Sequence, residues 1–469
     1  MTDNTLKQIE TFLNAWADLM WSTPLVVLLV GGGLFFMIYS RLQPYRYFGH
    51  AVDLLRGKYS DPNDPGHIPH SQALATALSG TLGLGNIAGV AIAISIGGPG
   101  AVFWMWVTAI VGVATKFYTA SLSVMFRGHD SLGVLRGGPM YVIMQGMGKR
   151  WYPLAALFAV ACMIGALPIF QANQFIQLLR DSVAIPAGWA TSEQHFMFDV
   201  IASATVAALV TLVVMGRIER IGRLTVRLVP TMVILYLGMT AVVLYTYSSD
   251  IPAVFLLIVT DAFTGEAAAG GSVGAAIMIG VRRGAFSNEA GIGTESLAHG
   301  AVKTTQPIRE GIVAMIGPVV DTLLVCTCTA LIILLTGVWQ SDAGLEGVTL
   351  TARAIEQVFP VTGIYLLLIM VGLLSFSTMV SMWFYGVKCA GFLFGAERQH
   401  YYTPIYISLI VVGAVVSMDI VNGLILGTYA TMAIPTMIST LVLAPKVNSA
   451  AKEYFAKLRR EKLVEAELD

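Results

Sequence analysis

Two clusters of glycine and polar residues interrupt stretches of sequence that are otherwise strongly apolar. The first spans residues 79–89 and reads SGTLGLGNIAG, with the amide of Asn86 near its centre. The second spans residues 286–295 and reads FSNEAGIGTE, with two carboxylates among its polar groups. Where a membrane helix unwinds, freed carbonyls hold a cation and half-helix N-termini present amides to an anionic group. The clusters therefore predict neighbouring sites for a cation and an anionic ligand.

Both clusters are interpreted as breaks in helices that lie inside a membrane. Gly80, Gly83, Gly85 and Gly89 are spread around a helix instead of lining one face, so they weaken it at its centre. The second cluster contains acids that cannot face lipid. An ordinary loop is the alternative there, but removing that span would reverse the sidedness of all later basic residues. We therefore predict a discontinuous helix at each cluster.

Two further polar patches lie within apolar stretches. The run SFSTMVS at 375–381 offers several hydroxyls. These either bond back to carbonyls one turn earlier or supply oxygen ligands to a sodium ion. The run FQANQ at 170–174 offers amides and an aromatic ring, for which helix packing and cavity lining are equal alternatives.

The composition is that of a membrane protein. The 469 residues include 28 basic and 28 acidic side chains, only 12% charged, against 56% hydrophobic residues, and the mean hydropathy is +0.73. So little charge cannot cover a soluble surface, and a net charge of zero excludes nucleic acid as a main partner. So much apolar sequence also excludes disorder. The cysteines are expected to pack as small apolar residues; they are Cys162, Cys326, Cys328 and Cys389.

Long apolar runs indicate an α-helical bundle and not a barrel, whose strands alternate over short segments. The first run lies too far from the N-terminus for a cleaved signal peptide. We predict eleven transmembrane helices, at residues 21–39, 72–95, 101–126, 152–180, 197–215, 225–247, 272–300, 309–337, 361–395, 403–420 and 422–443.

The basic residues predict how the chain is oriented. With the N-terminus outside and alternating spans, 22 of the 28 basic residues fall on the inside, three outside and three within spans. Such a bias follows the positive-inside rule. It predicts a multi-pass protein of the cell membrane (inner or plasma) with a cytoplasmic C-terminus, and it supports the count of eleven, because one span more or fewer would scramble the bias.

The breaks lie in the second and seventh predicted spans, five spans apart. Since five is odd, the second group of five helices crosses the membrane with opposite polarity, as in secondary transporters with inverted repeats. We predict an all-α integral membrane fold, with one N-terminal helix before a 5 + 5 inverted repeat whose halves each begin with a discontinuous helix. The predicted divisions are an N-terminal segment at 1–71, repeats at 72–247 and 248–444, and a cytoplasmic tail at 445–469.

Four motifs resemble the alanine or glycine:cation symporter family, and the resemblance covers nearly the whole chain. They are GLGNIAGVAIAISIGGPGAVFWMWVTAIVGVATKF at 83–117, GGPMYVI at 137–143, GAFSNEAGIGTESLAHGAVKT at 284–304 and FSTMVSMWFYG at 376–386. The resemblance implies a leucine-transporter-type fold and sodium-coupled import of small neutral amino acids, alanine and glycine above all, by alternating access. The implied partners are the amino acid, sodium and the lipid bilayer, with no cofactor, nucleic acid or protein partner.

The resemblance also implies roles for individual residues. The substrate would be bound by Gly83, Gly85, Asn86, Gln174, Phe286, Ser287, Asn288, Ser381 and Met382. Sodium would lie between backbone carbonyls of the first break and hydroxyls of the ninth span, a set comprising Thr81, Leu84, Ser377 and Thr378.

One stretch departs from the family motif. The motif has a glycine and a tryptophan where this chain has Ser381 and Met382, and Trp383 follows one residue later. A helical step of about 100° turns Trp383 onto a different face. If this position bounds the pocket, a flexible methionine alters its size, so the choice of substrate is open.

Acidic residues near the second break leave two mechanisms open. Glu289 and Gly291 are expected to hold or gate the unwound segment, with Glu289 bracing it or pairing with an arginine at 282 or 283. Glu289, Glu295 and Asp321 are also titratable groups at membrane depth, so a proton-coupled transporter of the same fold is the alternative. A channel would need a continuous polar pore, and the sequence lacks the metalloprotease, nucleophile-elbow and Walker A motifs of enzymes.

Overall fold

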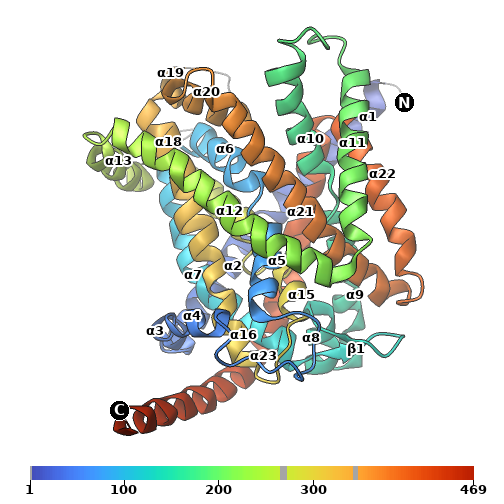
Figure 1. Ribbon diagram of the computed structural model, residues 1–469, viewed down its shortest axis with the longest axis vertical. Coiled ribbons are helices and arrows are strands. Elements are labelled where there is room, and N and C mark those ends of the chain that lie inside the picture. The colour runs from blue at the N-terminus through green and yellow to red at the C-terminus, as the bar shows by residue number, and fades with distance from the viewer. Residues whose placement is uncertain (1–2, 265–271, 342–346, 469) are drawn as a thin grey trace.

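The computed structural model describes residues 3–264, 272–341 and 347–468, which form a bundle of helices with a short β-hairpin (Figure 1). The hairpin pairs β1 (Gly128–His129) with β2 (Leu135–Arg136) in antiparallel register. The two ends of the chain lie at opposite ends of the molecule, and the last helix extends away from the bundle.

Seven helical segments in the described ranges are long and apolar enough to cross a membrane. They are Gly100–Met125 (α7), Lys149–Ala184 (through α9 and α10), Phe196–Val214 (α11), Ile218–Thr246 (in α12), Pro307–Thr336 (α16 to α18), Gly363–Phe394 (α21) and Met418–Glu461 (in α23). Two bent pairs raise the number to nine: α1 with α2, bent by 41°, and α5 with η1 and α6, bent by 58°.

The predicted count of eleven spans is therefore not confirmed. The stretch at 272–300 is divided into α14 (Val273–Asn288) and α15 (Glu295–His299), each shorter than the roughly 20 residues that a span needs. The stretch at 403–420 contains α22 (Tyr402–Val415), which ends because Val416 adopts an extended backbone. A break inside one helix and an early end of another account for the difference.

The other helices and helical turns either form parts of these spans or connect them. On the N-terminal side of the first break they are α1 (Asp3–Met20), α2 (Thr23–Tyr39), α3 (Gln43–Arg46), α4 (His50–Leu55) and α5 (His70–Thr81). Those that follow in the first half of the chain are η1 (Leu84–Asn86), α6 (Ala88–Gly97), α8 (Pro139–Val142), η2 (Ile143–Met147), η3 (Lys149–Trp151), α9 (Tyr152–Gly165), α10 (Ile169–Leu179), η4 (Arg180–Ala184) and α12 (Arg217–Thr246). The later ones are α13 (Ile251–Thr264), α16 (Pro307–Ala314), α17 (Ile316–Pro318), η5 (Val319–Cys326), α18 (Thr327–Thr336), α19 (Val338–Ser341), α20 (Val348–Val358), η6 (Gln399–Tyr401) and α23 (Met418–Leu468).

The broken helices lie at the centre of the bundle. Helix α14 packs closely on α7 because Gly280 and Gly284 have no side chains; a Cβ on Gly280 would lie 2.4 Å from the carbonyl oxygen of Ala101. Helix α5 packs against α12 and α21, and Figure 1 shows α12 crossing in front of it. By contrast, α11 exposes large apolar side chains such as Leu212, as a helix that faces lipid does.

The C-terminal helix α23 is continuous from Met418 to Leu468. The predicted boundary between the second repeat and the tail, at residues 444 and 445, therefore falls inside one helix. The N-terminal helix α1 packs along the beginning of α23, where Trp16 covers Gly427, and the Trp21 indole donates to the Leu426 carbonyl at 2.8 Å.

Candidate functional site

The first break separates α5 from α6 by a short turn. Helix α5 ends at Thr81, Gly83 is extended, and the turn η1 follows. The Gly83 amide donates to Asn86 Oδ1 at 2.9 Å, so the Asn86 side chain holds the unwound segment. A Cβ on Gly83 would lie 2.9 Å from Thr378 Oγ1, so this close approach requires glycine.

A buried carboxylate joins the first break to the second. Asp321 is fully buried in the π-helix η5, and its Oδ1 accepts from Asn86 Nδ2 at 2.6 Å. Its Oδ2 accepts from Ser287 Oγ at 2.7 Å, and Asn86 Nδ2 also donates to Ser287 Oγ at 3.1 Å. These three side chains form a closed triangle between the two broken helices. Single π-helical turns often occur at functional sites.

The Thr378 hydroxyl lies against carbonyls of the first broken helix. Thr378 Oγ1 is 3.0 Å from the carbonyl oxygen of Ser79, 3.4 Å from that of Leu82 and 2.9 Å from that of Leu374. One hydroxyl hydrogen cannot satisfy three carbonyls, so this cluster has more acceptor capacity than donors. An uncharged cluster of hydroxyl and carbonyl oxygens at a helix break fits a sodium ion.

The second break is held mainly by its own side chains. Glu289 adopts a left-handed backbone with φ 55°, and Gly291 and Gly293 follow with φ 87° and 97°. Thr294 Oγ1 donates to Glu289 Oε2 across the unwound segment. Tyr429 OH, on α23, donates to Glu289 Oε1 at 3.0 Å. Glu289 therefore braces the break, and Gly291 supplies a conformation that favours glycine.

The predicted alternative of a pair between Glu289 and an arginine is not found. Arg282 Nη1 forms an ion pair with Asp18 Oδ1 at 2.8 Å, which ties α14 to α1. Arg283 Nη1 is buried without a hydrogen-bond partner in the described part of the chain. Both arginines lie on α14 before the break, whereas the Glu289 side chain is taken by Thr294 and by α23.

Aromatic and apolar side chains close over the point where the breaks meet. A Cβ on Gly85 would lie 3.3 Å from the Phe286 ring, so the two breaks are in contact. The Phe286 ring centre is 5.2 Å from that of Tyr429 and 5.9 Å from that of Phe170. The Met382 sulfur is 4.0 Å from Tyr429 OH. A bulky ligand side chain here would require these rings to move.

Helix α7 adds a buried cation to the same region. Lys116 is 2% exposed, and a Cβ on Gly317 would lie 3.2 Å from its Nζ. Its charge attracts both Glu289 and Asp321. The two buried carboxylates of the breaks are thus partly balanced by one ammonium group.

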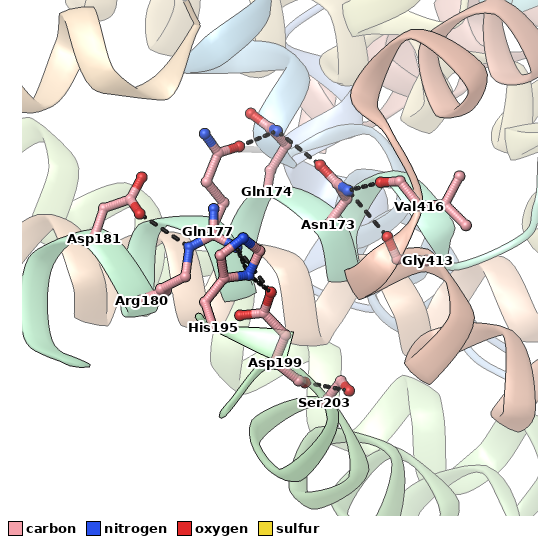
Figure 2. Close-up of polar contacts among 10 residues, drawn as sticks. All are labelled: Asn173, Gln174, Gln177, Arg180, Asp181, His195, Asp199, Ser203, Gly413 and Val416. Carbon is pink, nitrogen blue, oxygen red and sulfur yellow. Dashed lines mark hydrogen bonds and ion pairs between the residues drawn. The ribbon is translucent and has the colours of Figure 1, made fainter. Parts of the chain in front are cut away.

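The amide of Gln174 forms hydrogen bonds with its neighbours on α10. Its Nε2 donates to Asn173 Oδ1 and to Gln177 Oε1, both at 3.1 Å, along α10 (Figure 2). A Cβ on Gly347 would lie 3.8 Å both from Gln174 Oε1 and from the Cβ of Ala88, the first residue of α6. Gln174 and the start of α6 therefore both lie close to Gly347, which precedes α20.

Four other side chains of the predicted site form hydrogen bonds within a helix or between helices. The hydroxyls of Ser377 and Thr81 donate to carbonyls of their own helices at 3.0 Å and 3.3 Å. Ser381 Oγ donates to Ser79 Oγ at 3.0 Å, between α21 and α5. Asn288 Oδ1 accepts the amide of residue 290 at 2.9 Å and so caps α14. Of the two adjacent hydroxyls on α21, only that of Thr378 reaches the first break.

The sequence-based assignment omitted three residues that the structure brings to the breaks. From the sequence alone, Asp321 is interpreted only as a titratable group, although a carboxylate inside an apolar span is itself a signal of function. Lys116 carries the same signal, since an unpaired lysine in lipid is costly. Tyr429 carries none, because a tyrosine in an apolar helix is ordinary and its partner Glu289 is distant in sequence.

Comparison with known proteins identifies the family of the chain. The profile described as the sodium:alanine symporter family matches residues 6–467. The sodium/alanine symporter AgcS of Methanococcus maripaludis is 35% identical, over 95% of this chain and 97% of its own. The probable sodium/glutamine symporter GlnT of Bacillus subtilis is 33% identical, over 95% of this chain and 91% of its own.

A solved structure shares the fold. The crystal structure of MhsT in complex with L-phenylalanine superimposes with a TM-score of 0.56, covers 82% of this chain and 98% of its own, and is 13% identical in sequence. MhsT has the leucine-transporter-type fold, so this part of the predicted fold class is confirmed. The relatives are transporters and not enzymes. The chain belongs to the sodium:alanine symporter family.

Proposed function

We propose that the chain is a sodium-coupled symporter that imports a small neutral amino acid, alanine or glycine, by alternating access. The observation that carries the sodium claim is the oxygen cluster of Thr378 with the carbonyls of Ser79 and Leu82. Sodium bound there would link α21 to the first broken helix. Sodium and the amino acid would then favour the same arrangement of the two breaks, and coupling between the two ligands requires this.

The amino acid would lie where the two breaks meet. Its carboxylate would face the unwound segment from Gly83 to Asn86, next to the N-terminus of α6, where backbone amides favour an anion. Its side chain would face Phe286 and Met382. Support for a small side chain comes from the 3.3 Å approach of the Phe286 ring to a Cβ on Gly85.

The proposed orientation has the N-terminus outside and the C-terminal end of α23 in the cytoplasm. It follows from the excess of basic residues on one side of the predicted spans. In this orientation α5 and α15 are the cytoplasmic halves of the two broken helices, as an inverted repeat requires. The divisions at 72–247 and 248–444 remain part of the proposal.

Proton coupling is the second candidate, and buried acids favour it. Asp321 and Glu289 are fully or almost fully buried beside Lys116. Loss or gain of one proton would change the charge balance of this group. Glu295 lies on α15, where Oε1 accepts from Thr119 Oγ1 at 3.1 Å.

Uptake into proteoliposomes tests the proposal. We expect radiolabelled alanine to accumulate when sodium is present outside and the interior is negative, because one charge moved through 100 mV is worth about 2.3 kcal/mol, or roughly fiftyfold accumulation. Glycine should compete, and glutamine and phenylalanine test the size limit. Potassium or lithium replaces sodium as the control, and a pH gradient without sodium tests proton coupling. Uptake indifferent to sodium would contradict the proposal.

A further inference from the structure

Three buried titratable side chains outside the substrate region form a connected cluster. Glu310, in the first turn of α16, is fully buried and accepts from two imidazoles. His299 Nδ1 is 2.5 Å from Glu310 Oε1, and His70 Nδ1 is hydrogen-bonded to Glu310 Oε2. Both histidines are 1–2% exposed. We call His70, Glu310 and His299 the inner cluster.

The inner cluster joins the ends of both broken helices that are remote from the breaks. His70 is the first residue of α5, and His299 is the last residue of α15. Both half-helices therefore have one end at a break and the other at the Glu310 carboxylate. In Figure 1 these elements lie toward the end from which α23 extends.

Backbone contacts close the same end of the molecule. Ile68, just before α5, forms a parallel β-bridge with Val302, just after α15. The guanidinium of Arg127 donates to carbonyl oxygens on both sides of this contact, including those of Pro65 and Gly300. The segments that lead into α5 and out of α15 are thus held against each other.

Charged and titratable groups also lie on or next to the elements that pack against α16, which include α7, α4 and α23. Arg127, which follows α7, attracts the Glu310 carboxylate. On α4, His50 is 3.7 Å from Asp53 and is hydrogen-bonded to Tyr454 of α23 at 2.8 Å. His50 therefore contacts both Asp53 and Tyr454.

Helices α12 and α21 contact Thr76 of α5 through neutral side chains. Thr225 of α12 is 3.3 Å from Thr76 Oγ1, and Tyr385 of α21 donates to the Thr76 carbonyl at 3.4 Å. His70 Nε2 has no hydrogen-bond partner among the described residues. The bond to Glu310 is therefore the polar link by which the His70 side chain is held to α16.

We propose that the inner cluster is a protonation-sensitive latch that holds α5 against α15 and α16 and must separate for the site to open on that side. This inference rests on the proposed transport function, since the side in question is the one assigned to the cytoplasm. Histidine is the side chain that titrates near neutral pH. A proton on either imidazole turns its hydrogen bond to Glu310 into an ion pair, so acid strengthens the latch and slows opening.

Chemical labelling measures opening without transport. Ala77, on α5, is 3% exposed, and Ala77→Cys would become reactive when α5 moves away. The parent protein has Ala77→Cys as its sole cysteine and is labelled with a water-soluble maleimide without sodium or substrate. A second protein has Lys457→Cys, at an exposed position, as its sole cysteine. The ratio of the labelling rate of Ala77→Cys to the labelling rate of Lys457→Cys removes the pH dependence of thiol reactivity. We expect the ratio to fall about fivefold from pH 7.5 to pH 5.5, the range in which imidazoles gain protons.

Three variants separate the latch from general damage. His70→Asn removes the α5 end of the latch and should raise the ratio at pH 7.5 about tenfold, because a buried hydrogen bond is lost. Glu310→Gln keeps the shape but removes the charge, so the fall in acid should disappear. His299→Asn leaves the bond between α5 and α16 and should have a smaller effect than His70→Asn.

A second histidine–carboxylate pair provides the matched control. His195 Nδ1 is 2.6 Å from Asp199 Oδ2, and Arg180 Nη1 is 2.8 Å from the same oxygen (Figure 2). Arg180 begins η4, directly after α10, and His195 and Asp199 lie at the start of α11. His195→Asn should leave the ratio within about twofold, because neither helix is half of a broken one.

The outcomes distinguish this inference from the proposed function. A ratio that is unchanged in His70→Asn and in Glu310→Gln, for variants that elute as a single species, overturns the latch even if sodium-driven uptake is intact. A ratio that rises in His70→Asn and loses its pH dependence in Glu310→Gln supports the latch even if uptake proves not to need sodium. If one of these two variants does not fold, the other decides by the same criterion.

Discussion

The two breaks at the centre of the molecule are held in different ways. In the first, Asn86 and the carbonyls of Ser79 and Leu82 are held by groups on η5 and α21, which come from other parts of the chain. In the second, the bracing bond between Glu289 and Thr294 lies within the unwound segment. The first break therefore depends on partners that a ligand can replace, whereas the second is largely self-supporting.

This difference suggests a division of labour between the breaks. Neighbouring oxygens gather around the first break, which suits exchange between a protein hydroxyl and a bound sodium ion. The second break has three residues with positive φ, Glu289, Gly291 and Gly293, which fix its path. We expect changes at the first break to alter ion coupling, and changes at the second to alter stability and rate.

The largest effect is expected at Asp321, which connects the two breaks. Asp321→Ala leaves Asn86 Nδ2 and Ser287 Oγ without their carboxylate acceptor in a buried site. Each unsatisfied buried donor costs about 1–3 kcal/mol, so we expect sodium-driven alanine uptake to fall by at least about a hundredfold. Asp250→Ala removes an exposed carboxylate and serves as the control. Uptake within a factor of three of the unmodified protein would mean that the triangle does not join the breaks functionally.

A smaller and more specific effect is expected at Thr378. Thr378→Ala removes the hydroxyl that faces the first break, and the loss of one such ligand, about 1 kcal/mol, should raise the sodium concentration for half-maximal uptake about fivefold to tenfold. The ratio of alanine to glycine uptake should change less. Ser377→Ala is a matched control one residue away, because its hydroxyl donates to its own helix. Equal effects of the two substitutions would argue against a sodium site at Thr378.

The smallest effect is expected at Glu289, which braces the second break. Glu289→Gln keeps one acceptor oxygen for Thr294 or Tyr429, and the amide can donate to the other hydroxyl. Uptake should fall by only about threefold, since neutral hydrogen bonds replace charged ones. The pH profile of uptake between pH 5.5 and 8 should be unchanged. A profile that flattens in this variant would favour proton coupling through Glu289 over sodium coupling.

The positions of the breaks could be predicted because the bilayer makes them expensive. Glycines around a helix and polar groups at mid-depth are tolerated there only where protein or ligand satisfies the backbone. Both predicted breaks coincide with interruptions in the structure, at Gly83 and at Glu289–Thr294. The number of spans was less predictable, because hydropathy does not reveal where a helix such as α22 ends.

The site residues were only partly predictable. Gly83, Gly85, Asn86, Phe286, Ser287 and Thr378 meet around the breaks. Ser381 instead contacts Ser79, and Ser377 bonds within its helix. Adjacent hydroxyls on a helix are about 100° apart, so only their rotation relative to α5 decides which of them faces the break.

The sequence by itself determined a helical membrane protein, its family and the two places where helices are interrupted, because these follow from hydropathy, glycine content and motif. Only the tertiary structure decided which groups meet there. Asp321 joins Asn86 to Ser287, Tyr429 reaches Glu289 and Glu310 joins two distant histidines. These contacts connect residues up to 240 positions apart, and local patterns carry no information about pairs that only packing brings together.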